Sequence, residues 1–85
     1  MQKGNSKGGD NVRRSERIRF TRAIYSLTQQ EVADALGKGV SRNYISQIEN
    51  EKLQFSEDRY KEIMDAIYKV GEQKRRDLES KLKGK

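Results

Sequence analysis

Residues 27–50 read LTQQEVADALGKGVSRNYISQIEN, and this stretch decides the fold. Thr28 and Glu31 have the spacing of a capping box, in which the threonine hydroxyl accepts an unpaired N–H and the glutamate reaches back to the start of the helix. An apolar face follows at Val32, Ala33 and Leu36, and Gly37 stands where a left-handed residue would end the helix. The pattern predicts a helix of about eight residues that begins at Thr28.

A second short helix is predicted after the Gly37–Gly39 turn. Val40 provides an apolar plug, and the Ser41 side chain can cap the new helix. Ile45 and Ile48 have the spacing of an inward face. The exposed face then carries small polar and basic side chains, namely Arg42, Asn43, Ser46 and Gln47. Two short helices joined by a tight turn form a helix-turn-helix arrangement.

Helical patterns flank this unit on both sides. Ile18 and its neighbours predict a helix over residues 11–25, with Ile24 in its apolar stripe, and a helix capped by Ser56 carries an inward stripe over residues 56–70. The chain has no Pro and no alternating run of β-branched residues, so we expect an all-α bundle of four to five helices.

The two ends of the chain have a different character from the centre. Residues 1–10 contain three glycines and no periodicity, which predicts a disordered basic tail ahead of a helix-turn-helix domain over residues 11–70. Residues 71–85 form a basic extension with Leu78 and Leu82 at i, i+4. Because Gly71 weakens a helix by up to ~1 kcal/mol, a frayed extension or a short separate helix is favoured there over a dimerising helix.

The composition indicates the size of the folded domain and the kind of partner that it binds. The 85 residues are 32% hydrophobic and 38% charged, with a mean hydropathy of -1.12, which allows one small domain with solvated ends. The net charge of +6 favours a polyanion such as nucleic acid. The excess lies in residues 1–22 (+5) and 71–85 (+3), although basic ends are also common as solubilising tails. The centre is nearly neutral, so DNA recognition there must depend on a few placed groups.

Several classes of function are unattractive. The chain contains neither Cys nor His, which removes thiol nucleophiles, disulfides and the usual metal ligands. The acidic residues of the last predicted helix alternate with Lys and Arg at ion-pair spacing, as on a solvated face. No apolar run exceeds three residues, so no membrane span or signal peptide is predicted. We expect no enzyme, no cofactor, no metal and no small-molecule ligand.

The motif residues resemble a known family. Arg22, the LTQQEVADALG run from Leu27, and Val40-Ser41-Arg42 through Ile48-Glu49-Asn50 are similar to the Cro and phage-repressor (XRE) family over roughly residues 17–67. The resemblance implies the all-helical lambda-repressor-like fold and a structural ion pair between Arg22 and Glu49. It also implies base contacts from Ser41, Arg42, Asn43 and Gln47. Arg can grip guanine, and Asn or Gln can bond to adenine, so these residue types can read base edges.

Contacts to DNA phosphates are expected around these readers. Gln29 matches a phosphate-contacting position of the family and lies at a helix N-terminus, which favours anions. The expected set is Gln29, Lys38, Tyr44, Ser46 and Lys52. The chain departs from the family by inserting Lys38-Gly39 in the turn, and by Glu51 and Phe55 where Gly and Pro are frequent. A re-angled helix would bring Tyr44 or Ser46 to the bases in place of Arg42.

The sequence therefore indicates a sequence-specific, double-stranded DNA-binding transcriptional regulator of bacterial or phage type. The expected form is a homodimer on a two-fold symmetric operator whose half-sites are ~34 Å apart. Two alternatives remain open: an antitoxin whose residues 71–85 bind a partner protein, and a DNA-bending accessory of a mobile element. In each case we expect a cytoplasmic protein associated with the nucleoid.

Overall fold

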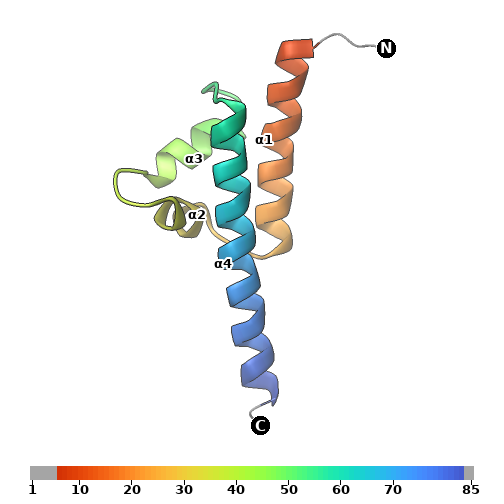
Figure 1. Cartoon of the computed structure of the whole chain (residues 1–85), viewed down its shortest axis with the longest axis vertical. Coiled ribbons are helices and arrows are strands. Elements are labelled where there is room, and N and C mark those ends of the chain that lie inside the picture. Colours follow the sequence, from red (N-terminus) through yellow and green to blue (C-terminus); the bar gives the residue numbers. More distant parts are fainter. Residues whose placement is uncertain (1–5, 84–85) are drawn as a thin grey trace.

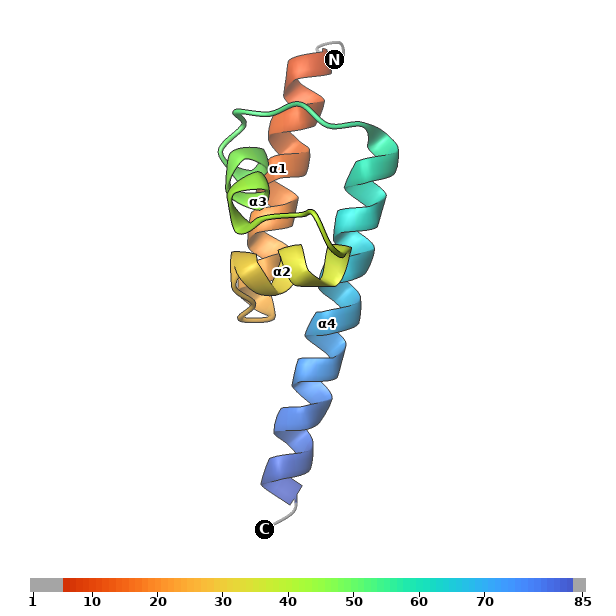
Figure 2. The same cartoon turned by 90° about the vertical axis from the view of Figure 1, so that its left-hand side faces the viewer.

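The computed structural model describes the backbone of residues 6–83 and the side chains of residues 13–83. The helices in that part are α1 (Ser6–Ile24), α2 (Gln29–Leu36), α3 (Arg42–Glu49) and α4 (Glu57–Lys83), and the same residues contain no strand. The long helices α1 and α4 run side by side, and the short helices α2 and α3 pack against one side of this pair (Figures 1 and 2). The all-α prediction is confirmed, with four helices and a long C-terminal one.

The core lies where the four helices meet. Five isoleucines, two from α3, two from α4 and one from α1, have no exposed surface: Ile18, Ile45, Ile48, Ile63 and Ile67. Leu27, Val32 and Ala33 complete the buried cluster, and Leu36 and Val40 pack against it while partly exposed. The predicted core residues thus lie together. Ile24 is the exception, since it is 77% exposed at the last position of α1 and does not belong to the inward stripe.

Both short helices are capped as their sequences predict. The Thr28 hydroxyl accepts the Glu31 N–H at 3.0 Å, and the Glu31 carboxylate accepts the Thr28 N–H at 2.7 Å. That second bond, from the Thr28 backbone, lowers the pKa of Glu31 below its ordinary value. The Ser41 hydroxyl accepts the Tyr44 N–H at 3.1 Å. Helices of eight residues are marginal in water, so these caps and the packing of their apolar faces stabilise them.

The turn between α2 and α3 accommodates the Lys38-Gly39 insertion. Gly37 has the predicted positive φ of 115°, but its ψ of -176° is extended rather than left-handed, a conformation that is essentially restricted to glycine. Gly39 also has a positive φ, at 86°. The Val40 N–H returns to the Gly37 carbonyl at 3.4 Å, and the Val40 side chain still reaches the core. The two extra residues therefore lengthen the turn without removing the apolar plug.

The first helix begins earlier than its sequence predicts. α1 starts at Ser6 rather than near residue 11, so residues 6–10 of the predicted disordered tail are helical, and residues 1–5 lie outside the described part of the chain. The physical reason is that a helix nucleated by its packed C-terminal half gains one hydrogen bond for each residue added, and residues 6–10 contain no Pro to stop it.

The last helix is continuous through Gly71 to Lys83, so residues 71–83 extend α4, and the alternative of a short separate helix in this stretch is wrong. Gly71 is buried, and the Tyr25 ring lies directly over it: a Cβ added to Gly71 would be 2.7 Å from Tyr25 Cδ1. The Tyr25 hydroxyl donates to Glu72 at 2.7 Å, and its ring meets Tyr68 edge to face with the centroids 6.1 Å apart. Because Gly71 has no side chain, the Tyr25 ring at the end of α1 can pack directly against α4. We call this contact the Gly71 seat. The contacts around Gly71 offset the low helix propensity of glycine.

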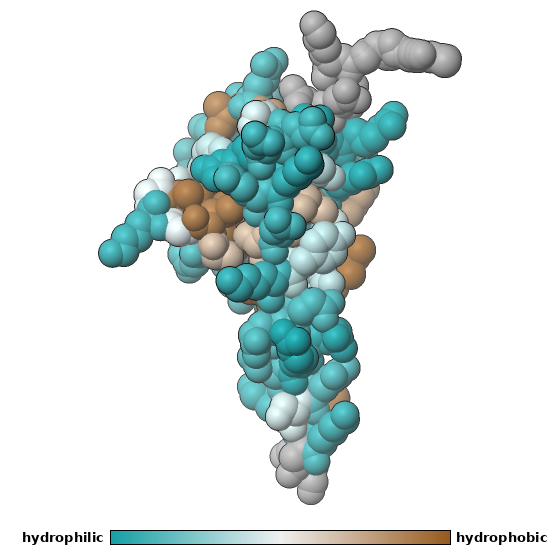
Figure 3. Space-filling view, viewed as in Figure 1, coloured by the Kyte–Doolittle hydropathy of each residue, from teal (hydrophilic) through white to brown (hydrophobic). Residues whose placement is uncertain are grey.

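Beyond this seat, α4 projects from the bundle (Figure 1). Its projecting part is covered mainly by hydrophilic side chains on the face seen in Figure 3. Leu78 and Leu82 are 54% and 76% exposed, and Arg75 lies between Glu72 and Glu79 at ion-pair distances of 2.7 and 2.8 Å. Intrahelical ion pairs at this spacing support an exposed helix by ~0.2–0.5 kcal/mol each, so the extension remains helical without a core of its own.

The contact between Gly71 and Tyr25 predicts that the effect of Gly71→Ala on stability changes sign when Tyr25 is replaced by Ala. Ala is ~1 kcal/mol better than Gly inside a helix, but Gly71→Ala must displace the Tyr25 ring, and overpacking costs ~1–3 kcal/mol. Gly71→Ala should therefore lower the free energy of unfolding in urea by up to ~2 kcal/mol in the wild type. In a Tyr25→Ala background the same change should raise it by ~1 kcal/mol. An effect of the same sign in both backgrounds would contradict the seat.

Candidate nucleic-acid interface

A buried ion pair fixes α3 to α1. The Glu49 side chain is 3% exposed, and Arg22 donates to both of its oxygens: Nε to Oε2 at 2.7 Å and Nη2 to Oε1 at 2.9 Å. The remaining guanidinium nitrogen of Arg22 donates to the Leu27 carbonyl at 2.8 Å, just ahead of α2. This is the pair expected from the sequence. A two-point contact between a guanidinium and a carboxylate sets orientation as well as distance, so it holds three elements in register.

Further polar contacts surround this pair. Gln29, the first residue of α2, donates its side-chain amide to Glu49 Oε1 at 3.1 Å. Ser15 of α1 is buried and donates to the Ile48 carbonyl at 2.7 Å, and Arg19 donates to the Glu49 carbonyl at 3.3 Å. The end of α3 thus has partners for its carbonyls, as a buried helix end requires. Gln29, expected at a phosphate, also links α2 to α3 from inside the protein.

The outer face of α3 is polar and continuous. Asn43, Ser46, Gln47 and Asn50 follow at i, i+3, i+4 and i+7, which places them on one line along the helix. Asn43 and Asn50 are exposed, Ser46 and Gln47 are half-buried, and Asn50 donates to the Ser46 hydroxyl at 3.3 Å. Arg42 is exposed on one flank of this line, and Tyr44 lies on the other flank. Ser41 is exposed at the N-cap, where its hydroxyl is engaged with the Tyr44 N–H.

The Tyr44 flank meets the first turn of α4. Arg59 Nε donates to the Tyr44 hydroxyl at 2.9 Å, and the guanidinium carbon lies 5.2 Å from the centroid of the Tyr44 ring. Arg59 Nη1 donates to Glu62 at 2.8 Å. The bond to Tyr44, supported by Glu62, raises the pKa of Arg59 above its ordinary value. The half-buried Tyr44 ring also packs against the core. Tyr44, which the sequence analysis expects at a phosphate, is therefore held in a fixed position by the protein.

Two lysines border the outer face of α3. Lys38 is exposed in the turn before the helix, and Lys52 is exposed in the loop after it. The Lys52 N–H donates to the Gln47 carbonyl at 2.8 Å, next to Glu51, whose φ of 63° is positive. The predicted base and phosphate residues from Ser41 to Lys52 therefore gather on and around one helix. Gln29 lies apart from them at the start of α2, where it is bonded to Glu49.

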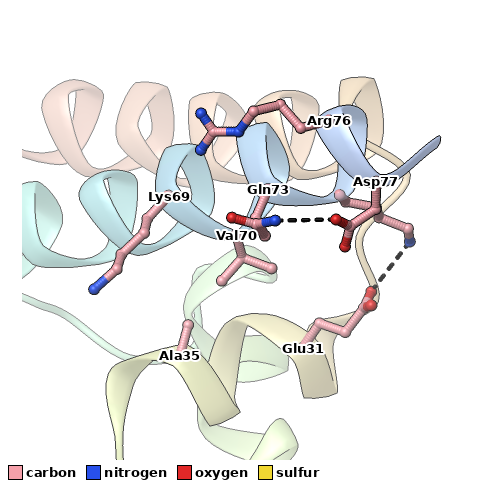
Figure 4. Close-up of a pocket in the computed structure, with 8 residues that line it drawn as sticks. Glu31, Ala35, Lys69, Val70, Gln73, Arg76 and Asp77 are labelled. Carbon is pink, nitrogen blue, oxygen red and sulfur yellow. Dashed lines mark hydrogen bonds and ion pairs between the residues drawn. The ribbon is translucent and has the colours of Figure 1, made fainter. Parts of the chain in front are cut away.

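A hollow of about 550 Å³ lies elsewhere, between α2 and α4 (Figure 4). Its floor includes Val70 and Ala35, and no residue of α3 lines it. Gln73 donates to Asp77 at 3.0 Å, and Lys74 lies 3.5 Å from Glu31 across the hollow. These contacts tie the base of the α4 extension to α2, and the hollow does not share the outer face of α3.

The arrangement defines the class of protein. A rigid bundle presents a short, capped helix whose outer face carries amide, hydroxyl and guanidinium groups, and the chemistry of those groups suits the edges of bases in a major groove. These features are those of a helix-turn-helix DNA-binding protein.

Comparison with known families identifies the group. A family model described as helix-turn-helix matches residues 18–67, which is more than half of the chain. The chain belongs to the Cro/C1-type helix-turn-helix (XRE) family, a family of DNA-binding regulators that are typically not enzymes. Searches of curated proteins and of solved structures returned no significant match. Within the described residues, no helix combines the length and apolar character that crossing a membrane requires.

Two residues of this surface escaped the sequence prediction. Asn50 extends the line of Asn43 and Gln47 by one turn, and the i, i+7 spacing from Asn43 is the signal that could have found it. Arg59 joins the surface through a contact with a residue fifteen positions away. No local pattern carries that information, because it depends on how α4 packs against α3.

The buried pair predicts a strongly asymmetric double-mutant cycle. Arg22→Met leaves the Glu49 carboxylate buried without a cation, which should lower the free energy of unfolding by ~3–5 kcal/mol. Adding Glu49→Leu should restore most of that loss, because no charge then remains buried. Urea unfolding of the two single variants and the double variant measures the stability lost with Arg22→Met and the stability regained when Glu49→Leu is added. A double variant as unstable as Arg22→Met would contradict this account of the pair.

Proposed function

We propose that the protein is a sequence-specific transcriptional regulator that binds double-stranded DNA by inserting α3 into the major groove. The observation that carries this proposal is the continuous polar face of α3, held at a set angle by the Arg22–Glu49 pair. Membership of the Cro/C1-type family supports it. A regulator of this kind, from a bacterium or phage, acts on nucleoid DNA in the cytoplasm.

Base reading is assigned to the outer face of α3 and its N-terminal flank. In this proposal Ser41, Arg42, Asn43 and Gln47 contact base edges. Asn50 lies on the same line and joins this group. An Arg side chain can bond to two atoms of guanine, and Asn and Gln amides can do the same with adenine, so a short sequence can be read without a large basic surface.

Phosphate contacts are assigned to the borders of that face. Lys38 and Lys52 are exposed on either side of α3 in the chain, and Tyr44 and Ser46 lie along it. Gln29 can serve a phosphate with the N-terminal N–H groups of α2 while its amide remains on Glu49. Such contacts position the helix in the groove and carry no sequence information directly.

Readers and anchors should respond differently to substitution. Arg42→Ala should cost ~1–3 kcal/mol on the preferred site and relax the selected sequence at one base pair, because a two-point base contact is lost. Lys52→Ala should weaken binding to all duplexes about equally and reduce the salt slope by ~1, because one phosphate contact is lost. Selection from random duplexes, followed by titrations at several salt concentrations, measures both. A selected motif unchanged by Arg42→Ala would exclude Arg42 as a reader.

We propose further that the regulator acts as a homodimer on a two-fold symmetric operator. The large apolar side chains that remain exposed in the described part of the chain are Phe20, Ile24, Tyr68, Leu78 and Leu82. They belong to α1 and α4, and none belongs to α2 or α3. A protein contact through those helices would leave the α3 face available to DNA. The exposed Leu78 and Leu82 also favour the second candidate, an antitoxin-type contact of residues 71–85 with a different protein.

The projecting part of α4 provides the test of self-association. Leu78→Glu should convert a dimer to monomers and shorten the footprint on the operator to one half-site, because it places a charge in an apolar contact. Ser80→Glu makes the same change of charge on another side of the helix and should leave the dimer intact. Analytical ultracentrifugation measures the mass of each variant. A wild-type protein that stays monomeric on and off DNA would refute the homodimer and leave the protein-partner candidate.

A further inference from the structure

Arg59 borders α3, and neither the sequence motif nor the family resemblance assigns it a role. It lies in the first turn of α4, where its own N–H is bonded to the Ser56 hydroxyl at 3.1 Å. Its side chain crosses to α3, and 32% of it is exposed. Figure 2 shows that a long loop joins α3 to the start of α4. The hydrogen bond from Arg59 to Tyr44 links these two helices directly.

The contacts of Arg59 leave donors available. Nε bonds to the Tyr44 hydroxyl and Nη1 to Glu62, and among the described residues no acceptor is bonded to Nη2. The Tyr44 oxygen accepts from Arg59, so the hydroxyl proton remains free to donate elsewhere. A guanidinium N–H and a phenol O–H, held together by the bond between them, form a two-donor site for an anionic oxygen.

The place of this pair on the surface indicates which anion it meets. Tyr44 lies on the flank of α3 opposite Arg42, so an α3 inserted into the major groove presents the two flanks to the two phosphate backbones that wall the groove. Glu49 lies on the Arg42 flank, and Gln29 is bonded to Glu49. Gln29, at the start of α2, is therefore the phosphate contact on this flank. The Tyr44 flank adjoins Arg59. Each wall therefore has side chains that can contact phosphates.

We propose that Arg59 and Tyr44 together bind one phosphate of the DNA backbone, with Arg59 Nη2 and the Tyr44 hydroxyl as the two donors. This inference rests on the proposed DNA-binding function and adds to it a phosphate site that includes α4. Glu62 accepts from Arg59 Nη1 and helps to hold the guanidinium in place. Because the contact is to the backbone, it adds affinity for every sequence and contributes nothing to base selection.

The test separates the charge of Arg59 from the hydroxyl of Tyr44. Binding is titrated over a range of salt concentrations on the selected operator duplex and on a duplex of scrambled sequence. Arg59→Gln should reduce the slope of log K against log salt by ~0.9 on both duplexes, the amount expected for one phosphate contact. Arg59→Lys keeps the charge and should restore the slope. Tyr44→Phe should weaken binding about three- to tenfold without changing the slope, because it removes one hydrogen bond and no charge.

Arg75→Gln is the matched control, because Arg75 is also an α4 arginine paired with glutamates at i-3 and i+4, but it lies on the projecting part of the helix. It should leave the slope unchanged. A slope for Arg59→Gln equal to that of the wild type, or a decrease equal to that of Arg75→Gln, would overturn the phosphate site while the DNA-binding function stands. A wild-type protein that binds neither duplex would overturn the proposed function and this inference with it. Circular dichroism verifies that each variant is folded.

Discussion

The Arg22–Glu49 pair is the constraint on which the rest of the structure depends. It joins α1 to the last turn of α3, and through Leu27 and Gln29 it also reaches the start of α2. A core built largely from isoleucine packs well but is not directional, so it does not by itself set the angle of a short helix. The two-point ion pair supplies that direction. The outer face of α3 can therefore keep a set geometry although the helix has only eight residues.

A small number of contacts made by α1 and α4 supports the unit formed by α2 and α3. Gly71 allows the Tyr25 ring to lie on α4, which fixes the end of α1, and Lys74 donates to the Ser26 carbonyl at 2.6 Å in the link between α1 and α2. At the other end of the bundle, Arg59 joins α4 to α3 through Tyr44. Helix α4 thus contacts the link ahead of α2 through Lys74 and contacts α3 through Arg59. For a domain with so small a core, these contacts are a substantial share of the stability.

The charge distribution differs between the centre of the chain and its two ends. The centre of the chain is nearly neutral, and the polar groups on the outer face of α3 are amides, a hydroxyl and one guanidinium rather than a broad basic patch. In the proposed complex such a surface selects a sequence by geometry, and the excess positive charge at the two ends of the chain adds to the attraction for DNA of any sequence. In the same proposed complex Arg59 supplies one cation from the centre of the chain, and its bond to Tyr44 fixes the position of that charge.

The sequence by itself determined the elements whose causes are local. The capping box at Thr28, the cap at Ser41 and the apolar spacing of Ile45 and Ile48 identify α2 and α3, because each depends on residues within one or two turns of one another. The family motif added the Arg22–Glu49 pair, which local reasoning alone does not provide.

Only the tertiary structure decided the features that join distant parts of the chain. It made Gly71 a seat for Tyr25 instead of a break in α4, and it brought Arg59 to Tyr44. It left Ile24 outside the core. The physical reason is the same in each case: which side chains meet across helices depends on how the helices pack, and residue spacing within one helix does not record that.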